Sequence, residues 1–211
     1  MKLKTNILIY RDSRSWGQIP SNAKVERYDR TIRWPQLLST HLSKQANVIE
    51  ECLPGRTLGM LEEGQRAYRN GLEVFKSIYP SHLPIQYVIL DLGTNDLKKS
   101  CNQTASDLYN NIKLYHDYLM NFGWKIATNP QLIYLLPTKP GLDLEIFDSR
   151  STVLFELKNL CNKDNSFTTI PCSSFSPNSR PSKNSDGVHL DKSQHFVYSW
   201  FFKEYFEKLL K

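Results

Sequence analysis

Short apolar runs that alternate with segments of helical periodicity constrain the fold of this chain more than any other feature. The clearest runs are residues 7–10, 84–93 and 131–137, which are rich in Ile, Leu, Val and Tyr. Continuous apolar runs of this length are typical of strands buried on both faces of a parallel sheet. Weaker runs at residues 46–51 and 167–172 bring the expected strands to five.

Helical spacing of apolar residues fills the intervals between these runs. In one interval they recur every three or four positions from Leu108 to Leu119, and Thr104 can cap the helix that they predict. Strands that alternate with helices predict a parallel sheet covered on both faces, within a single α/β domain over residues 1–211. We expect helices over residues 34–44, 61–79, 104–122, 152–160 and 191–211, with Asn70-Gly71 as a break in the second.

The last expected helix is rich in aromatic residues. We expect it to face the core through Phe196, Trp200, Phe201, Tyr205 and Leu209. Residues 18–33, 140–148 and 173–185 contain proline and interrupt the alternation, so we expect loops there.

The composition is that of an ordinary globular chain. Of its 211 residues, 40% are hydrophobic and 12% aromatic, which argues against disorder and suffices for a substantial core. No apolar run approaches the roughly 18 residues of a membrane span. The charged pair Arg11-Asp12 follows the first short run too soon for a signal peptide. We therefore expect a cytoplasmic protein that does not associate with membranes.

Cysteine spacing and charge limit the partners of the protein. Cys52, Cys101, Cys161 and Cys172 are far apart and form no CxxC pair, which predicts free thiols and no metal site. The net charge of +6 permits attraction to anions, but no basic helix or stacking motif predicts nucleic-acid binding. Residues 1–34 hold eight Lys or Arg against three Asp or Glu, and their scatter favours a solvated basic face.

Polar clusters follow four of the five expected strands. Because the carboxyl ends of parallel strands share one edge of the sheet, these clusters can meet in one crevice. They are Asp12-Ser13, Gly55-Arg56-Thr57, Gly93-Thr94-Asn95-Asp96 and Asp186-Gly187-Val188-His189.

The clusters contain a complete set of groups for acyl transfer. Ser13 can act as the nucleophile, His189 as its base, and Asp186 as the carboxylate that orients the base. A spacing of three residues lets Asp186 and His189 face each other within one turn. The N–H groups of Ser13 and Gly55 and the side-chain amide of Asn95 can stabilise a developing oxyanion.

On these residues the chain resembles the SGNH, or GDSL-type, serine esterases. Their four blocks are present in order as Arg11-Asp12-Ser13, Leu53-Pro54-Gly55-Arg56-Thr57, Gly93-Thr94-Asn95-Asp96 and Asp186-Gly187-Val188-His189. Further similarity is to the branch of bacterial arylesterases, acetyl-xylan-type esterases and acyltransferases. It rests on Ser15-Trp16-Gly17, Arg27-Tyr28 with Arg33-Trp34, Val48-Ile49-Glu50-Glu51 and Arg69-Asn70-Gly71. The resemblance covers residues 5–195, although residues 138–170 carry little of it.

The resemblance implies a flavodoxin-like, three-layer α/β/α fold and hydrolysis of short-chain, acetyl-type esters without a cofactor or metal. It implies the same roles for Ser13, His189, Asp186, Gly55 and Asn95. The substrate is then a small-molecule ester, and transfer of the acyl group to an alcohol stays open as a side activity. Members of this branch often form homo-oligomers, so a homo-oligomer is one of the states to test.

Two arginines depart from the family pattern, which normally has Gly before the Asp and Leu-Thr after the Ser. Arg11 could reach into the crevice to bind an anionic group of the substrate, or turn outward, and we favour the outward position. For Arg14 we expect a place on the surface of the first helix. An alternative function follows from both: a catalytically impaired protein that binds a ligand or partner in the same crevice.

Other residues near the blocks have structural and functional interpretations. Trp16 and Trp34 could line a substrate pocket or pack in the core, and Arg56 could brace its loop or line the pocket. Asp12 is expected to bond backbone groups of the nucleophile turn, and Asp96 to brace its own turn. The remaining histidines, at positions 41, 82, 116 and 195, have no partner that the sequence identifies, and we expect surface or helix-face positions for them.

Overall fold

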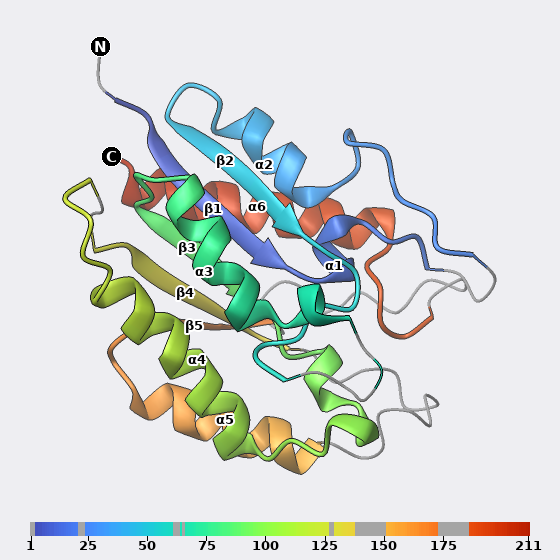
Figure 1. The fold of residues 1–211 in the computed structure, drawn as a ribbon. Helices are drawn as coiled ribbons and strands as arrows, with labels where there is room; N and C mark the ends of the chain where they lie inside the picture. Colours follow the sequence, from blue (N-terminus) through green and yellow to red (C-terminus); the bar gives the residue numbers. More distant parts are fainter. Residues whose placement is uncertain are drawn as a thin grey trace.

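A computed structural model of the chain describes residues 3–20, 24–60, 64, 66–126, 129–137, 151–172 and 186–211. Its centre is a five-stranded sheet in which every pairing is parallel and the strand order is β2-β1-β3-β4-β5 (Figure 1). The strands are β1 (Thr5–Arg11), β2 (Ala46–Cys52), β3 (Tyr87–Asp91), β4 (Gln131–Leu136) and β5 (Thr168–Pro171). The predicted five-stranded α/β fold is confirmed, and its strand order is that of flavodoxin-like proteins.

Helices cover both faces of the sheet (Figure 1). One face packs against α3 (Gly71–Ser81), α4 (Ala105–Met120) and α5 (Ser151–Lys163), and the other against α2 (Trp34–His41) and α6 (Lys192–Leu209). The short helix α1 (Ser13–Trp16) follows β1 directly. The described residues also form three 3₁₀ turns, η1 (Ala67–Arg69), η2 (Asn95–Leu97) and η3 (Lys99–Cys101).

The strands divide their side chains between two cores because successive residues of a strand point to opposite faces. In β1, Leu8 and Tyr10 join the core under α3, α4 and α5, whereas Ile7 and Ile9 join the core under α2 and α6. All four side chains are fully buried. This is why the run at residues 7–10 is apolar throughout instead of alternating.

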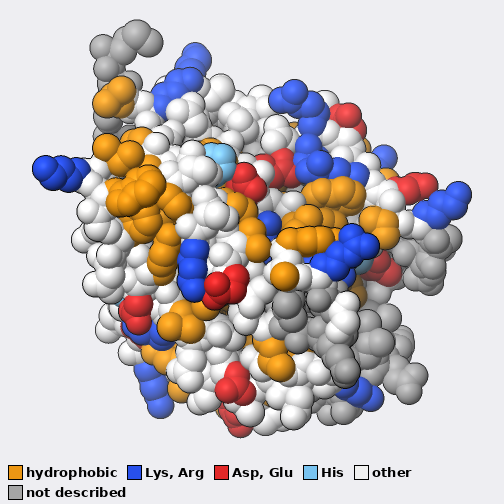
Figure 2. Space-filling view, in the orientation of Figure 1, with side chains coloured by type: hydrophobic (Ala, Val, Ile, Leu, Met, Phe, Trp, Pro, Cys, Tyr) orange, Lys and Arg blue, Asp and Glu red, His pale blue; other side chains and the backbone are white. Residues whose placement is uncertain are grey.

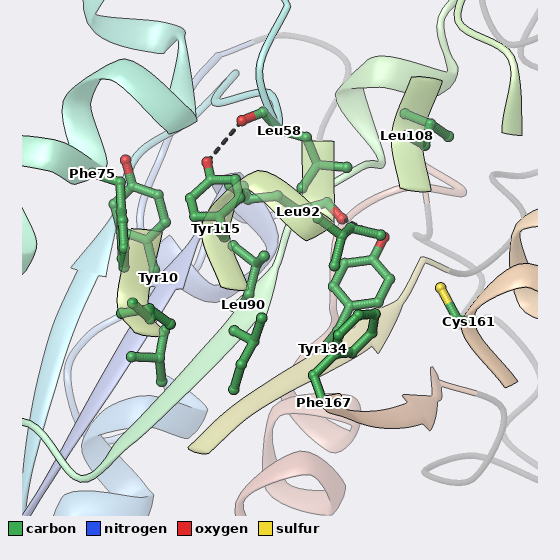
Figure 3. Close-up of a cluster of buried hydrophobic side chains, with 14 of the residues drawn as sticks. Tyr10, Leu58, Phe75, Leu90, Leu92, Leu108, Tyr115, Tyr134, Cys161 and Phe167 are labelled. Atoms are coloured by element: carbon green, nitrogen blue, oxygen red, sulfur yellow. Dashed lines mark hydrogen bonds between the residues drawn. The ribbon is translucent and has the colours of Figure 1, made fainter. Parts of the chain in front are cut away.

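Aromatic packing is dense in the first of these cores (Figure 3). The rings of Tyr10 and Phe75 meet edge to face with centroids 5.0 Å apart, and Tyr115 packs in the same way on Phe75. The hydroxyl of Tyr115 donates to the carbonyl oxygen of Leu58 at 2.7 Å. This bond ties α4 to the loop that follows β2, so the core supports the edge of the sheet where the polar clusters lie.

Two helix predictions are confirmed only in part. In the described residues of the segment 61–79 the expected break at Asn70-Gly71 is confirmed, but the piece before it is the 3₁₀ turn η1. The helix α3 begins at Gly71 because the Asn70 side chain caps it by accepting from the N–H of Glu73. On α6 the predicted core-facing stripe is correct only for Phe201 and Tyr205, which are half-buried and pack against the core, whereas Phe196, Trp200 and Leu209 are exposed. The buried residues of α6 are His195, Tyr198, Ser199, Phe202 and Phe206.

The basic residues near the N-terminus are only partly solvated. Arg11, Arg14 and Arg33 are buried, which contradicts a basic face made by all eight cations of residues 1–34. Lys and Arg side chains on the face seen in Figure 2 are spread out, with Asp and Glu among them. All four cysteines are free, as predicted.

Two of the predicted loops, at residues 140–148 and 173–185, lie outside the described residues. Among the helices of the part that the structure describes, none has the length and apolar character needed to cross a bilayer.

Candidate active site

Ser13 lies at the start of α1, where the chain leaves the inner strand β1. Asp12 caps this helix, because its Oδ1 accepts from the N–H of Arg14 at 2.9 Å, as predicted. Gly17 ends the helix at φ +86°, a left-handed conformation that side chains disfavour, and its N–H donates to the carbonyl of Ser13 at 3.1 Å. The nucleophile candidate therefore stands on a tight turn at the edge where the strand order reverses.

Asp186 and His189 face each other within one turn, and His189 reaches Ser13. His189 Nδ1 lies 2.6 Å from Asp186 Oδ2, and His189 Nε2 lies 2.9 Å from Ser13 Oγ. The other carboxylate oxygen, Oδ1, accepts from the N–H groups of Val188 at 3.0 Å and His189 at 2.8 Å. The structure thus joins two segments 176 residues apart in one hydrogen-bonded chain of side chains.

The electrostatics of this chain favour an ionised Asp186. Burial opposes the charge, but hydrogen bonds from the His189 side chain and from the backbone of His189 and Val188 lower the pKa of Asp186 to about 2. A carboxylate can only accept, so His189 Nδ1 must carry a proton, and a neutral ring then leaves Nε2 as the acceptor for the Ser13 hydroxyl.

The second and third blocks are fastened to the nucleophile turn. Leu53 donates its N–H to the carbonyl of Arg11 at 3.0 Å, which places the loop with Gly55 beside the end of β1. Asn95 Nδ2 donates to the carbonyl of Arg56 at 3.0 Å and lies 3.5 Å from Asp12 Oδ2. The two predicted oxyanion donors of these blocks are therefore linked to each other and to the turn of Ser13.

Gly55 adopts a conformation that suits only glycine. Its φ is +76°, and a Cβ at this position would lie 3.0 Å from Cζ of the Arg69 guanidinium. The sequence did not draw attention to this neighbour, because Arg69 follows Gly55 by 14 positions within a different segment.

Asp96 is a buried residue that stabilises the same edge of the sheet. Both of its carboxylate oxygens lie 3.0 Å from the N–H of Leu58, and the residue is fully buried. Burial raises its pKa to about 7, against the pull of these backbone donors. Asp96 thus holds the loop of the second block to the turn of the third, which is the structural part that we predicted for it.

The positions of Arg11 and Arg14 differ from our predictions. Arg11 is 0% exposed and forms an ion pair with Asp91, its Nε lying 2.5 Å from Asp91 Oδ2. It therefore does not turn outward, and its buried guanidinium gives no support to a contact with substrate. Arg14 is also buried, and its Nη2 donates to the hydroxyl of Tyr198 at 3.3 Å, so the predicted place on the helix surface is wrong. Asp91, Ser15 and Tyr198 are neighbours of the turn that sequence reasoning missed.

Arg56 is a structural residue of its loop. It is 4% exposed, its guanidinium lies 4.1 Å from the centre of the Tyr10 ring, and its Nη1 donates to the carbonyls of Arg11 and Glu51. The prediction that it lines the substrate pocket is not supported by this buried position. Trp16 remains partly exposed, with the Arg27 guanidinium 4.7 Å from its ring, and stays a candidate for the pocket.

Trp34 and His195 belong to the core. Trp34 is 0% exposed and stacks on Phe202 at 5.0 Å. His195 lies on a helix, α6, but it is 0% exposed and its Nδ1 accepts from the N–H of Trp34 at 3.3 Å. For this histidine the surface alternative and the expected lack of a partner are therefore wrong. His82 has a partner in Glu51, with 2.8 Å between Nε2 and Oε1.

The strand order, the layers and the position of these blocks define a chain with the SGNH hydrolase fold, and comparisons with known proteins agree. An M. smegmatis aryl esterase is 24% identical with a TM-score of 0.84, over 98% of this chain and 100% of that one. A carbohydrate acetylesterase from Sinorhizobium meliloti is 22% identical with a TM-score of 0.84 over the same shares.

More distant structures share the fold as well. A member of the lipolytic protein G-D-S-L family from Veillonella parvula is 14% identical with a TM-score of 0.66, over 96% of this chain and 98% of that one. No protein-family model matches the sequence, and no curated protein matches it significantly. Identities at this level show a common fold.

Proposed function

We propose that the protein is a serine esterase that hydrolyses short-chain, acetyl-type esters through an acyl-enzyme on Ser13. The observation that carries this proposal is the continuous chain from Asp186 through His189 to Ser13, with contacts of 2.6 Å and 2.9 Å. The names of the structural neighbours, an aryl esterase and a carbohydrate acetylesterase, support the same reaction class.

In the acylation step, Ser13 Oγ attacks the carbonyl carbon of the ester while His189 Nε2 accepts the hydroxyl proton. The carbonyl oxygen becomes an oxyanion, and the N–H groups of Ser13 and Gly55 with the amide of Asn95 are its proposed donors. Each such donor lowers the barrier by about 3 kcal/mol. Collapse of the tetrahedral intermediate breaks the bond to the alkoxy oxygen, which takes the proton from His189 and leaves as the alcohol.

Deacylation repeats these steps with water. His189 Nε2 takes a proton from the water as its oxygen attacks the acyl carbon, and the proton returns to Ser13 Oγ as the acid leaves. Asp186 keeps its negative charge throughout and stabilises the imidazolium that forms twice in the cycle. An alcohol in place of water would give the acyltransferase side activity.

A catalytically impaired binding protein is the weaker alternative. Arg11 and Arg14 motivated it, since both depart from the usual nucleophile block. In the structure both side chains are buried beside the turn, and the contacts among Ser13, His189 and Asp186 are complete in their presence. The two arginines therefore give no reason to expect an inactive site.

Hydrolysis of p-nitrophenyl esters of increasing acyl length tests the proposal. We expect the acetyl ester to be turned over fastest and the activity to be lost in Ser13→Ala, with Ser77→Ala, an exposed serine of α3, as the matched control. A panel of acetylated sugars then asks whether the alcohol part is a carbohydrate. Activity that persists in Ser13→Ala contradicts the assignment.

A further inference from the structure

A buried ion pair joins the ends of two adjacent inner strands, β1 and β3, next to the nucleophile turn. Arg11 and Asp91 are register partners at the last positions of β1 and β3, and Arg11 Nε lies 2.5 Å from Asp91 Oδ2. Arg11 is 0% exposed and Asp91 2%. A guanidinium is buried in this way only with a counter-charge, because removing an ion from water is costly. Asp91 is that counter-charge.

The guanidinium of Arg11 also reaches the helix that carries Ser13. Arg11 Nη1 donates to Ser15 Oγ at 2.8 Å, and the indole Nε1 of Trp34 donates to the same oxygen at 2.5 Å. Ser15 is fully buried. Since α1 has only four residues, these two bonds fasten a large part of it to the end of β1 and to α2.

Arg11 contacts two further elements around the turn. Its Cζ lies 5.6 Å from the centre of the Tyr198 ring on α6, within the range of a cation–π contact. Its carbonyl oxygen accepts from Leu53 and Arg56, which belong to the loop of Gly55. One residue thus links β3, α1, α6 and the second block, although it touches none of Ser13, His189 and Asp186 through a hydrogen bond in the described part of the chain.

We infer that Arg11 is a positioning residue for Ser13, with Asp91 as its counter-charge and Ser15 as the group through which it acts. This inference rests on the proposed function. The pair would hold α1 so that Ser13 Oγ faces His189 Nε2 and the N–H of Ser13 faces the oxyanion. A displacement of about 1 Å in such an arrangement costs about 100-fold in rate. Gly at position 11, the usual residue of the family block, has no side chain to do this.

The test compares variants by the rate at which a fluorophosphonate probe labels Ser13, and by kcat and KM for p-nitrophenyl acetate. Ser15→Ala removes the oxygen that accepts from Arg11, whereas Ser15→Thr keeps a hydroxyl. Arg11→Met removes the charge, and Arg11→Met combined with Asp91→Leu also removes the carboxylate that would otherwise be left alone. All rates are measured at a temperature where near-ultraviolet circular dichroism shows each variant to be folded.

We expect Ser15→Ala and Arg11→Met to lower kcat and the labelling rate by about 10- to 100-fold, with KM within about twofold of wild type. Ser15→Thr should retain most of the rate. Lys113→Met, which breaks the contacts of α4 with Asp164 and Ser166 far along the chain from the site, is the control. It should lower the melting temperature and leave kcat unchanged.

Wild-type rates in both Ser15→Ala and Arg11→Met, with only a lower melting temperature, would overturn the inference, because the pair would then serve stability alone. If Arg11→Met does not fold, the comparison of Ser15→Ala with Ser15→Thr decides. Absence of Ser13 labelling in the wild-type protein is a different failure. It would refute the proposed function first, and the positioning role with it.

Discussion

His189 Nδ1 lies 2.6 Å from Asp186 Oδ2, within a turn that the same carboxylate organises through two backbone N–H groups. The side chain of Asp186 therefore fixes both the place of the histidine in the fold and the proton on its Nδ1. Since Oδ1 receives the backbone bonds and Oδ2 receives the imidazole, the two tasks fall to different oxygens of one residue.

This division predicts the effect of Asp186→Asn. An asparagine can keep the backbone bonds through its oxygen, but its amide nitrogen faces the imidazole as a donor and favours the wrong tautomer. We expect kcat to fall by about 10³- to 10⁴-fold, with a small change in stability. Asp107→Asn, at the exposed cap of α4, is the control and should keep kcat. An Asp186→Asn enzyme within about tenfold of wild type would contradict the assigned role.

Asn95 is the side-chain donor whose loss should be visible in kcat. Its Nδ2 has two hydrogens: one is used by the carbonyl of Arg56, and the other, which makes only a long 3.5 Å contact with Asp12 Oδ2, is proposed to turn to the oxyanion. We expect Asn95→Ala to lower kcat for p-nitrophenyl acetate by about 10²- to 10³-fold. Asn47→Ala, which removes an exposed amide on β2, should have no effect on turnover. Equal kcat in the two variants would remove Asn95 from the oxyanion site.

Gly17 is required at the end of α1 for two separable reasons. Its φ is +86°, and a Cβ would come within 2.6 Å of Cγ and Cδ of Arg33, a buried side chain that is paired with Glu50. Gly64 has a φ of +76° and nothing within 4 Å of such a Cβ. We expect urea unfolding to show a loss of about 1 kcal/mol for Gly64→Ala and a larger loss for Gly17→Ala. Equal losses of stability would show that the Arg33 side chain moves away from the new Cβ at no cost in free energy.

His195 makes the fold sensitive to acid. Burial, helped by the nearby charges of Arg11, Arg14 and Arg33, lowers its pKa to about 3. Below the unfolded pKa of about 6.5 the unfolded chain takes up a proton that the folded chain refuses, so stability falls as the pH drops from 6.5 towards 3. The full loss is up to about 5 kcal/mol, at 1.36 kcal/mol for each pH unit.

Buried carboxyl groups also make the stability of the fold depend on pH, so a variant is needed to separate the contribution of His195. The raised pKa of Asp96, about 7, has the opposite sign and favours folding as the pH falls below 7. His195→Asn keeps an acceptor for the N–H of Trp34 but cannot titrate. We expect its melting temperature to fall less than that of wild type between pH 6.5 and 4.5. An equal fall in the melting temperatures of wild type and His195→Asn over this pH range would contradict a buried neutral histidine.

The sheet and the residues of the candidate site could be predicted from the sequence because both depend on local sequence patterns. The run at residues 7–10 is apolar on every residue, as a strand between two cores must be, and the topology of a parallel sheet then brings Ser13, Gly55 and Asn95 to one edge. Asp186 and His189 are close in sequence, so their contact is a local one.

The buried charges could not be predicted in the same way, because their partners are distant. Arg11 and Asp91 are 80 positions apart, and only the register of β1 with β3 makes them neighbours. One signal was available: an aspartate inside the apolar run of residues 84–93 requires a buried partner. On α6 the aromatic residues occupy several faces, so hydrophobicity alone did not identify the face on which His195 and Ser199 are buried.

The most direct measurement of the central claim is to trap the acyl-enzyme. Wild-type protein mixed rapidly with p-nitrophenyl acetate and quenched in acid is digested, and the peptides are analysed by mass spectrometry. The account predicts one acetyl group, carried by Ser13, formed at the rate of the first turnover and absent in Ser13→Ala. An acetyl group on another residue, or rapid turnover without acetylation of Ser13, would contradict it.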